Sequence, residues 1–404
     1  MITYTNELLK DTNIIFNYIQ SESWREKIEI NPNKTLFPFL LYFDEFETNN
    51  PLGSHRGVQK LGAVYISMPS FPPELASKLE SIFLVLLFNS IDKKQVGNTE
   101  IFKSLISEIK DLEENGIEVL INNESIKLYF CLALIVGDNL GLHGMMGFSE
   151  SFVANYPCRF CRCSKTVCQK QLFQIDNELR NTENYEIDVN TENMAETGIV
   201  ERSIWNTIHS FHVVNNYSVD LMHDILEGVC GYDIFKTLNH RIKFFNYGPT
   251  GIRNRPPLFS ENTLKSISKT IKMSASEMWN FVRYLGLLIG DLVDVESEYW
   301  SLYILLKKIL DIVTSNCIGP ECPSLLEILI SEHNDLYLRL TKLNLKPKFH
   351  HLIHYPMVMQ KIGPLINIWS MRFEAKHKES KTAASAISSR KNICYTLVLK
   401  SQLK

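Results

Sequence analysis

The chain has 404 residues, with 42 lysines and arginines against 45 aspartates and glutamates, so its formal net charge at pH 7 is only −3. This near-balance excludes a uniform polycation, and a composition of 45% hydrophobic and 22% charged residues excludes a disordered chain. The longest apolar runs, at 82–88 and 129–136, are far shorter than the roughly 20 residues that cross a bilayer, so we expect no membrane partner.

The first part of the chain predicts the start of a sheet. Residues 1–33 form a short N-terminal segment whose polar start lacks the features of a secretory signal, which favours a reducing compartment. Apolar runs at 35–43 and 61–68 then predict two strands, with a turn between them at 49–53.

Two helices and a hairpin are predicted next. Apolar residues recur with helical spacing at 71–95 and 99–114. The segments 117–121 and 126–136 predict a hairpin whose second strand is long and buried. Residues 34–150 are therefore expected to form the first part of an α/β core with a mixed sheet.

The rest of the chain predicts a helical insertion followed by a return to the core. Residues 165–200 are polar and predict a mobile connector within an insertion that spans 151–345. The C-terminal part of the core, 346–404, carries a last predicted helix at 367–385. Helical periodicity within the insertion falls at 221–229, 264–273, 278–288, 299–313 and 325–345.

Two acidic residues, Asp44 and Asp138, each follow a predicted strand of this sheet. If the two strands are neighbours, their carboxylates converge at the sheet edge where open α/β sheets bind ligands. Paired carboxylates suit Mg²⁺ or Mn²⁺, and two such ions about 4 Å apart can hold both oxygens of a phosphodiester displacement. The alternative is that each aspartate only caps a turn.

The nine cysteines favour a metal site over a disulfide framework, because their number is odd and four of them lie between 158 and 168. Cys158 and Cys161 have the Cys-x2-Cys spacing of half a tetrahedral zinc site. His350 and His354 are four residues apart and supply the other half on one helical face.

Other ligand sets remain open at this stage. His351 can replace His350, and Cys163 with Cys168 can complete a local site of four cysteines. The alternative without metal is a set of reduced cysteines beside packed or solvated histidines.

A third acidic residue, Glu374, lies in a strongly basic part of the chain. Residues 341–404 hold 12 lysines and arginines but only Glu374 and Glu379 as acids, a balance of +10, which leaves −13 for residues 1–340. From the charge pattern alone Glu374 is a salt-bridge partner rather than a metal ligand. Its basic surroundings also suit the attraction of DNA phosphates.

The motif that contains Asp220, His223 and Glu227 allows two interpretations. At spacings i, i+3 and i+7 these side chains share one face of a helix and can reach DNA or a metal in a cleft. The alternative, which capping preferences favour, is a helix start with Asp220 as its N-cap.

Taken in order, these features resemble the catalytic core of DDE transposases of the CACTA (EnSpm) kind. The resemblance is more distant to Transib transposases and to the catalytic subunit of the V(D)J recombinase. It covers about 35–395 and includes Gly137-Asp-Asn-Leu-Gly-Leu and Tyr156-Pro-Cys-Arg-Phe-Cys. The other matching segments are 41–53, 60–65, 220–228 and 348–356.

The resemblance implies a ribonuclease H-like core with a large helical insertion, and a nuclear enzyme that cleaves and transfers DNA strands. A homodimer or higher oligomer is compatible with it. It assigns Mg²⁺ (or Mn²⁺) binding and catalysis to Asp44, Asp138 and Glu374. It assigns Zn²⁺ binding to Cys158, Cys161, His350 and His354.

The alternative is a catalytically silent, truncated relic that binds DNA or a protein partner, in the nucleus or the cytoplasm. Only 43 residues precede Asp44, which leaves no room for a separate N-terminal DNA-binding domain, and only 30 follow Glu374. These lengths favour a relic or an isolated catalytic fragment, whereas the presence of all three acids favours an enzyme.

Overall fold

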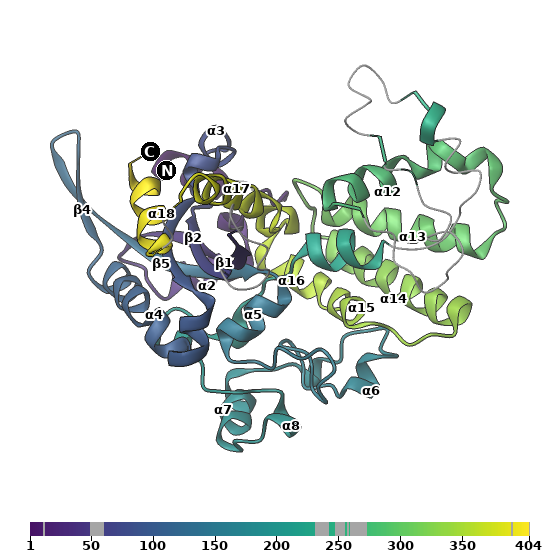
Figure 1. Ribbon diagram of the computed structural model, residues 1–404, viewed down its shortest axis with the longest axis horizontal. Helices are drawn as coiled ribbons and strands as arrows, with labels where there is room; N and C mark the ends of the chain where they lie inside the picture. The colour runs from purple at the N-terminus through teal and green to yellow at the C-terminus, as the bar shows by residue number, and fades with distance from the viewer. Residues whose placement is uncertain are drawn as a thin grey trace.

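A computed structural model describes residues 1–10, 13–48, 60–230, 242–246, 255–256, 258, 273–388 and 391–403 (Figure 1). The predicted turn at 49–53 and nearly all of the predicted helix at 264–273 lie outside these residues. No helix within the described part of the chain is both long and apolar enough to span a bilayer.

A five-stranded mixed sheet forms the core, in the order β3-β2-β1-β5-β4. β1 pairs antiparallel with β2 and parallel with β5, while β3 and β4 form the antiparallel edges. The predictions of an α/β core, of its first two strands and of the hairpin are therefore confirmed. The strands are β1 Thr35–Glu47, β2 Lys60–Ser67, β3 Phe83–Asn89, β4 Ile117–Ile121 and β5 Glu124–Gly137.

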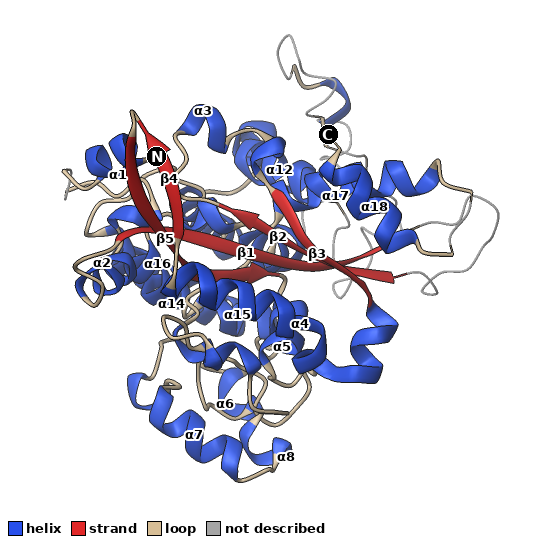
Figure 2. Ribbon diagram, turned by 90° about the vertical axis from the view of Figure 1, so that its left-hand side faces the viewer, coloured by secondary structure: helices blue, strands red, loops and turns tan. Residues whose placement is uncertain are grey.

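Helices cover both faces of the sheet (Figure 2). Because side chains alternate along a strand, Tyr42 and Phe43 of β1 enter different cores. The Phe43 side packs on α4 Ser90–Glu114, which bends at Gly97 (φ +80°), and on α5 Asn139–Met146. The Tyr42 side packs on helices from the two ends of the chain: α1 Ile2–Leu8, η1 Tyr18–Gln20, α2 Glu22–Glu29, α16 Tyr355–Ile362, η8 Leu365–Ile368, α17 Met371–Ser385 and α18 Ile393–Gln402.

The predicted helix at 71–95 is wrong. Short turns, α3 Pro73–Ala76 and η2 Leu79–Ser81, lead instead into the edge strand β3. Residues 83–88 are all apolar, and so short an apolar run fits a helix and a strand equally well. Pairing with β2 decides in favour of the strand.

The helical insertion lies beside the sheet and shares the Tyr42-side core (Figure 1). From residue 221 on, four of its described helices match predicted ones, with ends that shift by at most four residues. The first of them, η6, is a π-helix, a form that is often found at functional sites. They are η6 Met222–Val229, α12 Ala275–Ile289, α13 Glu298–Val313 and α14 Cys322–Thr341. The short η7 Gly290–Leu292 was not predicted, and α15 Pro347–Leu352 begins the C-terminal part of the core.

The predicted mobile connector at 165–200 is also wrong, because this segment is anchored. Tyr185 is fully buried, and the buried carboxylate of Asp188 pairs with Arg162 and Arg180 at 2.9 and 3.0 Å. Two of its polar residues, Asn181 and Asn193, cap short helices, which composition alone does not reveal. The short helices of this segment are α6 Lys165–Cys168, η3 Asp176–Glu178, α7 Thr182–Asn190 and α8 Met194–Thr197, followed by η4 Ile204–Thr207 and η5 Val213–Asn215.

Candidate active site and metal centre

The parallel pairing of β1 and β5 brings Asp44 and Asp138 to the same edge of the sheet. Phe43 lies opposite Gly137 in this pairing, so the two aspartates follow at the same level. Asp44 does not follow its strand as predicted, because β1 continues to Glu47. Asp138 does follow β5, and its carboxylate caps α5 by accepting a hydrogen bond from the N–H of Gly141 at 2.5 Å. Capping uses one of two carboxylate oxygens and does not exclude a metal.

Helix α17 packs against β1 and carries Glu374 toward the same edge. The ring of Phe373 stacks on Tyr42 of β1 with centroids 4.2 Å apart. One turn further along, His377 Nδ1 lies 3.4 Å from Asp44 Oδ2. The Oε1 atom of Glu374 itself lies 3.5 Å from His223 Nε2. We call Asp44, Asp138 and Glu374 the acid edge.

The electrostatic effect of the other two carboxylates is seen at Asp44. Burial raises the pKa of Asp44 to about 7, and the negative charges of Asp138 and Glu374 add to this rise. Burial also raises the pKa of Glu374, against the opposing effect of His223. Raised pKa values of neighbouring carboxyl groups are common at functional sites.

The motif at 220–228 contributes to this edge. Asp220 is buried and accepts a hydrogen bond from the hydroxyl of Ser370 at 2.7 Å and another from the imidazole of His223. Burial alone would lower the pKa of His223, but Asp220 and Glu374 raise it to about 9. Glu227 is exposed. Asp220 therefore holds a charged imidazole against Glu374, which goes beyond the predicted helix cap.

We expect Asp44→Asn to stabilise the metal-free protein at pH 8. Because the pKa of Asp44 is about 7 in the folded protein, this residue ionises at lower pH in the unfolded chain than in the folded one. The folded protein therefore loses stability relative to the unfolded chain as pH rises from about 4 to about 7. The variant should therefore gain on the order of 2–4 kcal/mol above pH 7, and this gain should vanish near pH 4. Thermal unfolding of both proteins across this range measures it, and a constant difference at every pH would contradict the assignment.

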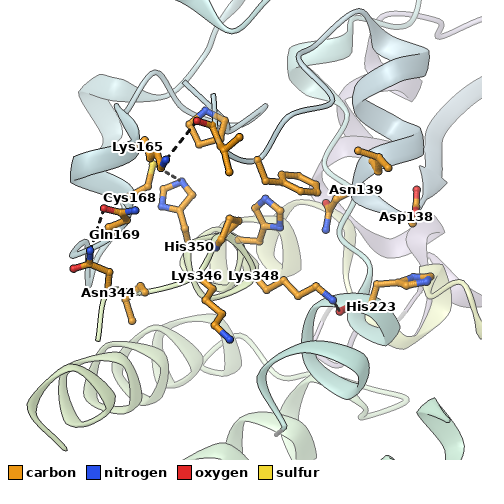
Figure 3. A pocket seen from close by; sticks show the side chains of 17 residues that line it. Asp138, Asn139, Lys165, Cys168, Gln169, His223, Asn344, Lys346, Lys348 and His350 are labelled. Atoms are coloured by element: carbon orange, nitrogen blue, oxygen red, sulfur yellow. Dashed lines mark hydrogen bonds between the residues drawn. The ribbon is translucent and has the colours of Figure 1, made fainter. Parts of the chain in front are cut away.

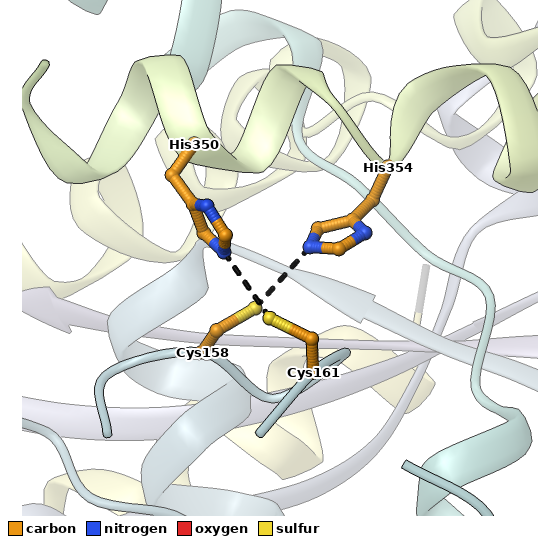
Figure 4. Close-up of side chains that lie close together, drawn as sticks. All are labelled: Cys158, Cys161, His350 and His354. Carbon is orange, nitrogen blue, oxygen red and sulfur yellow. Dashed lines mark hydrogen bonds between the residues drawn. The ribbon is translucent and has the colours of Figure 1, made fainter. Parts of the chain in front are cut away.

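Cys158, Cys161, His350 and His354 converge at one buried point (Figure 4). We call these residues the Cys2His2 cluster. Cys158 Sγ lies 3.5 Å from His354 Nε2, and Cys161 Sγ lies 3.4 Å from His350 Nε2. A tetrahedral zinc with ordinary bond lengths separates sulfur and nitrogen ligands by about 3.6 Å. The cluster therefore has the size of a zinc site and could hold an ion such as Zn²⁺.

The surroundings of the cluster also suit a metal. His354 Nδ1 contacts Gln174 Oε1 at 2.9 Å, which orients Nε2 toward the thiols as an outer-shell partner does. Burial alone would raise the pKa of Cys158, but Cys161 and the two imidazoles bring it well below its usual value, which favours the thiolate. The two histidines reach one point even though His354 lies at the junction of α15 and α16.

The alternative ligands lie outside this group. His351 turns away, with its Nδ1 3.2 Å from Asp224 Oδ1. Cys168 Sγ is 3.5 Å from His350 Nε2 and also contacts the carbonyl of Cys163, which places it next to the cluster. Among the described residues, the Cys2His2 cluster is the one group of three or more His, Cys, Asp or Glu whose ligand atoms all lie within 4.8 Å of one another. Within the described part of the chain, the carboxylates of the acid edge do not form such a group.

Two cavities meet at Asp138, which lines both. One, of about 730 Å³, extends from Asp138 and His223 to Cys168 and His350 (Figure 3). The other, of about 790 Å³, contains Asp44. Lysines line both, namely Lys165, Lys346 and Lys348 in the first and Lys60, Lys93 and Lys94 in the second.

Sequence reasoning missed several residues at these sites. His377 lies three residues after Glu374, and this spacing was a usable signal. Arg159, Asn139 and Asp224 form buried hydrogen bonds between the acid edge and the cluster, and no spacing in the sequence indicates this. No protein-family model matches the chain, and no curated protein matches it. An assignment of function therefore depends on the geometry.

Proposed function

We propose that the chain is a transposon-derived catalytic core of the DDE transposase type, with a ribonuclease H-like fold, that cleaves and transfers DNA strands. One observation supports the proposal: Asp44 and Asp138 lie at the same level of the neighbouring strands β1 and β5, and the pKa of Asp44, raised by burial, is raised further by the charge of Glu374, which lies 236 positions after Asp138. The antiparallel β1-β2-β3 unit, extended by the parallel β5, is consistent with this fold.

The acid edge offers the ligands that the reaction needs. Two Mg²⁺ ions bound there would stabilise the attacking and leaving oxygens of a phosphodiester. Asp44 must first lose its proton, so cation binding should strengthen as pH rises through about 7. His223, held by Asp220 and carrying a proton, is placed to donate a hydrogen bond to a phosphate oxygen near Glu374.

The charge around the acid edge suits a DNA strand. Lysines in both cavities that meet at Asp138 can neutralise phosphates on either side of a scissile bond. The balance of +10 over 341–404 extends this attraction along the segment that bears Glu374. We propose the nucleus as the site of action, because the substrate is DNA.

Nicking of supercoiled plasmid in the presence of Mg²⁺ tests the proposal. We expect the wild type to nick and Asp138→Ala to lose at least about 100-fold in rate, because a metal ligand is removed. Asp111→Ala, at an exposed position near the end of α4, serves as a matched control and should nick normally. Equal nicking by wild type and Asp138→Ala, or nicking by neither, would reject the enzyme.

A second candidate is a catalytically silent relic that binds DNA or a protein, because the carboxylates of the acid edge do not lie as close together as the ligands of the Cys2His2 cluster. In that case the Cys2His2 cluster would stabilise a binding module. Plasmid binding without nicking by any of these proteins would identify it.

A further inference from the structure

A chain of buried polar side chains joins the Cys2His2 cluster to the acid edge. Arg159 lies between Cys158 and Cys161 in the sequence and is buried. Its Nη1 donates a hydrogen bond to Asn139 Oδ1 at 2.7 Å. Asn139 Nδ2 in turn donates to Asp224 Oδ1 at 2.7 Å. Two side-chain hydrogen bonds thus connect the segment 158–161, which bears the two cysteines of the cluster, to the π-helix η6.

Asp224 connects the same chain to the histidine half of the cluster. It has no exposed surface, and its Oδ1 also lies 3.2 Å from His351 Nδ1. Its Oδ2 accepts a hydrogen bond from the hydroxyl of Tyr355 at 3.2 Å. We call Arg159, Asn139, Asp224, His351 and Tyr355 the buried relay.

Each end of the relay is next in sequence to a residue of one of the two sites. Asn139 follows Asp138, and Asp224 follows His223. Arg159 follows Cys158, while His351 and Tyr355 follow His350 and His354. A shift of the backbone at one site therefore moves a relay residue, and through it the neighbour of a residue at the other site.

The relay is stiff because its charges are buried. Arg159 is 3% exposed and Asp224 is 0% exposed, so separating either from its partners would leave an uncompensated charge away from water. Burial alone would raise the pKa of Asp224, but His351, Asn139 and Lys348 lower it, which keeps the carboxylate ionised. A metal that fixes 158–161 against 350–354 would thereby fix Asn139 and Asp224 as well.

We propose that Asn139 and Asp224 are positioning residues that couple occupancy of the Cys2His2 cluster to divalent-cation binding at the acid edge. The inference rests on the proposed function, because it takes the acid edge as a cation site. Zinc held by the cluster orients Asp138 and His223 through the relay. By thermodynamic linkage, metal binding at the Cys2His2 cluster and cation binding at the acid edge change each other's affinity by the same factor.

The test measures Mn²⁺ affinity by electron paramagnetic resonance in zinc-loaded protein. We expect Asn139→Ala and Asp224→Asn to weaken Mn²⁺ binding by roughly 10-fold or more, the effect of losing an outer-shell partner, with zinc content unchanged. The matched control is Glu113→Gln. Glu113 is also a buried carboxylate, and it lies at the end of α4 beside Lys34, which precedes β1, rather than at the edge that holds Asp44 and Asp138.

Each outcome decides the matter. Weaker Mn²⁺ binding in Asn139→Ala, with normal binding in Glu113→Gln, supports the coupling even if Asp224→Asn fails to fold. Unchanged affinity in Asn139→Ala, or an equal loss in Glu113→Gln, overturns the coupling and leaves the proposed function intact. Absence of Mn²⁺ binding by the wild type overturns both.

Discussion

Replacing Cys158 with serine is expected to remove zinc from the protein, from about one ion per chain to almost none, and to destabilise the fold by several kcal/mol. A serine hydroxyl does not ionise at neutral pH and cannot replace a thiolate. The cluster also joins segments that are far apart in the chain, since Cys158 and His354 are separated by 196 positions. Loss of this link increases the freedom of the whole insertion.

Metal analysis and thermal unfolding of the purified variant measure both effects, and His354→Ala should behave in the same way. Cys394→Ser, at a half-buried cysteine on α18, is the control and should keep its zinc. Cys168→Ser should also keep it, because the four remaining ligands complete a tetrahedron. Loss of zinc in Cys168→Ser together with retention in Cys158→Ser would show that the ion uses a different set of residues.

The cluster could be predicted from the sequence because its ligands are paired by spacing. Cys158 with Cys161, and His350 with His354, are recognisable two by two. Choosing between His350 and His351 required the structure, because neighbouring histidines on one short helix point in different directions. The contact of His351 with Asp224, which lies 127 positions away, decides it.

The strands of the sheet could be predicted where turn residues mark their ends, and the prediction was wrong for β3, where the local sequence fits a helix equally well. β1, β2 and the β4-β5 hairpin have boundaries marked by turn residues. β3 is uniformly apolar, and its pairing with β2 is a tertiary fact that no local pattern contains. The prediction for 165–200 was wrong for a similar reason. Charged residues such as Asp188 and Arg180 are usually exposed, so the sequence alone does not indicate that this pair is buried.

The surroundings of Glu374 at the acid edge could not be predicted from the sequence, because they depend on contacts between distant segments. Local charge pattern favoured a salt bridge for Glu374, and the structure does place His223 Nε2 3.5 Å from it. In addition to burial, the negative charge of Glu374 also raises the pKa of Asp44. A salt bridge and a metal ligand are therefore compatible at this position, and chemistry has to distinguish them.

Glu374→Gln is expected to lower Mg²⁺-dependent nicking by at least about 100-fold, because the amide keeps the shape of the side chain but weakens its binding of a cation. The fold should remain, since Phe373 still stacks on Tyr42. Loss of the charge opposite His223 should also lower the pKa of that imidazole from its value of about 9. A pH titration of His223 followed by NMR checks this shift independently of activity.

Glu379→Gln is the matched control, because Glu374 and Glu379 are the two acids of 341–404 and lie on the same helix. Glu379 contacts Lys376 at 3.3 Å, on a part of α17 that does not form the acid edge, so its variant should nick at the wild-type rate. Equal loss in both variants would mean that α17 needs negative charge only for its stability. A normal rate in Glu374→Gln, with loss in Asp138→Ala, would mean that Asp44 and Asp138 bind the cation without Glu374. Helix α17 would then take no part in catalysis.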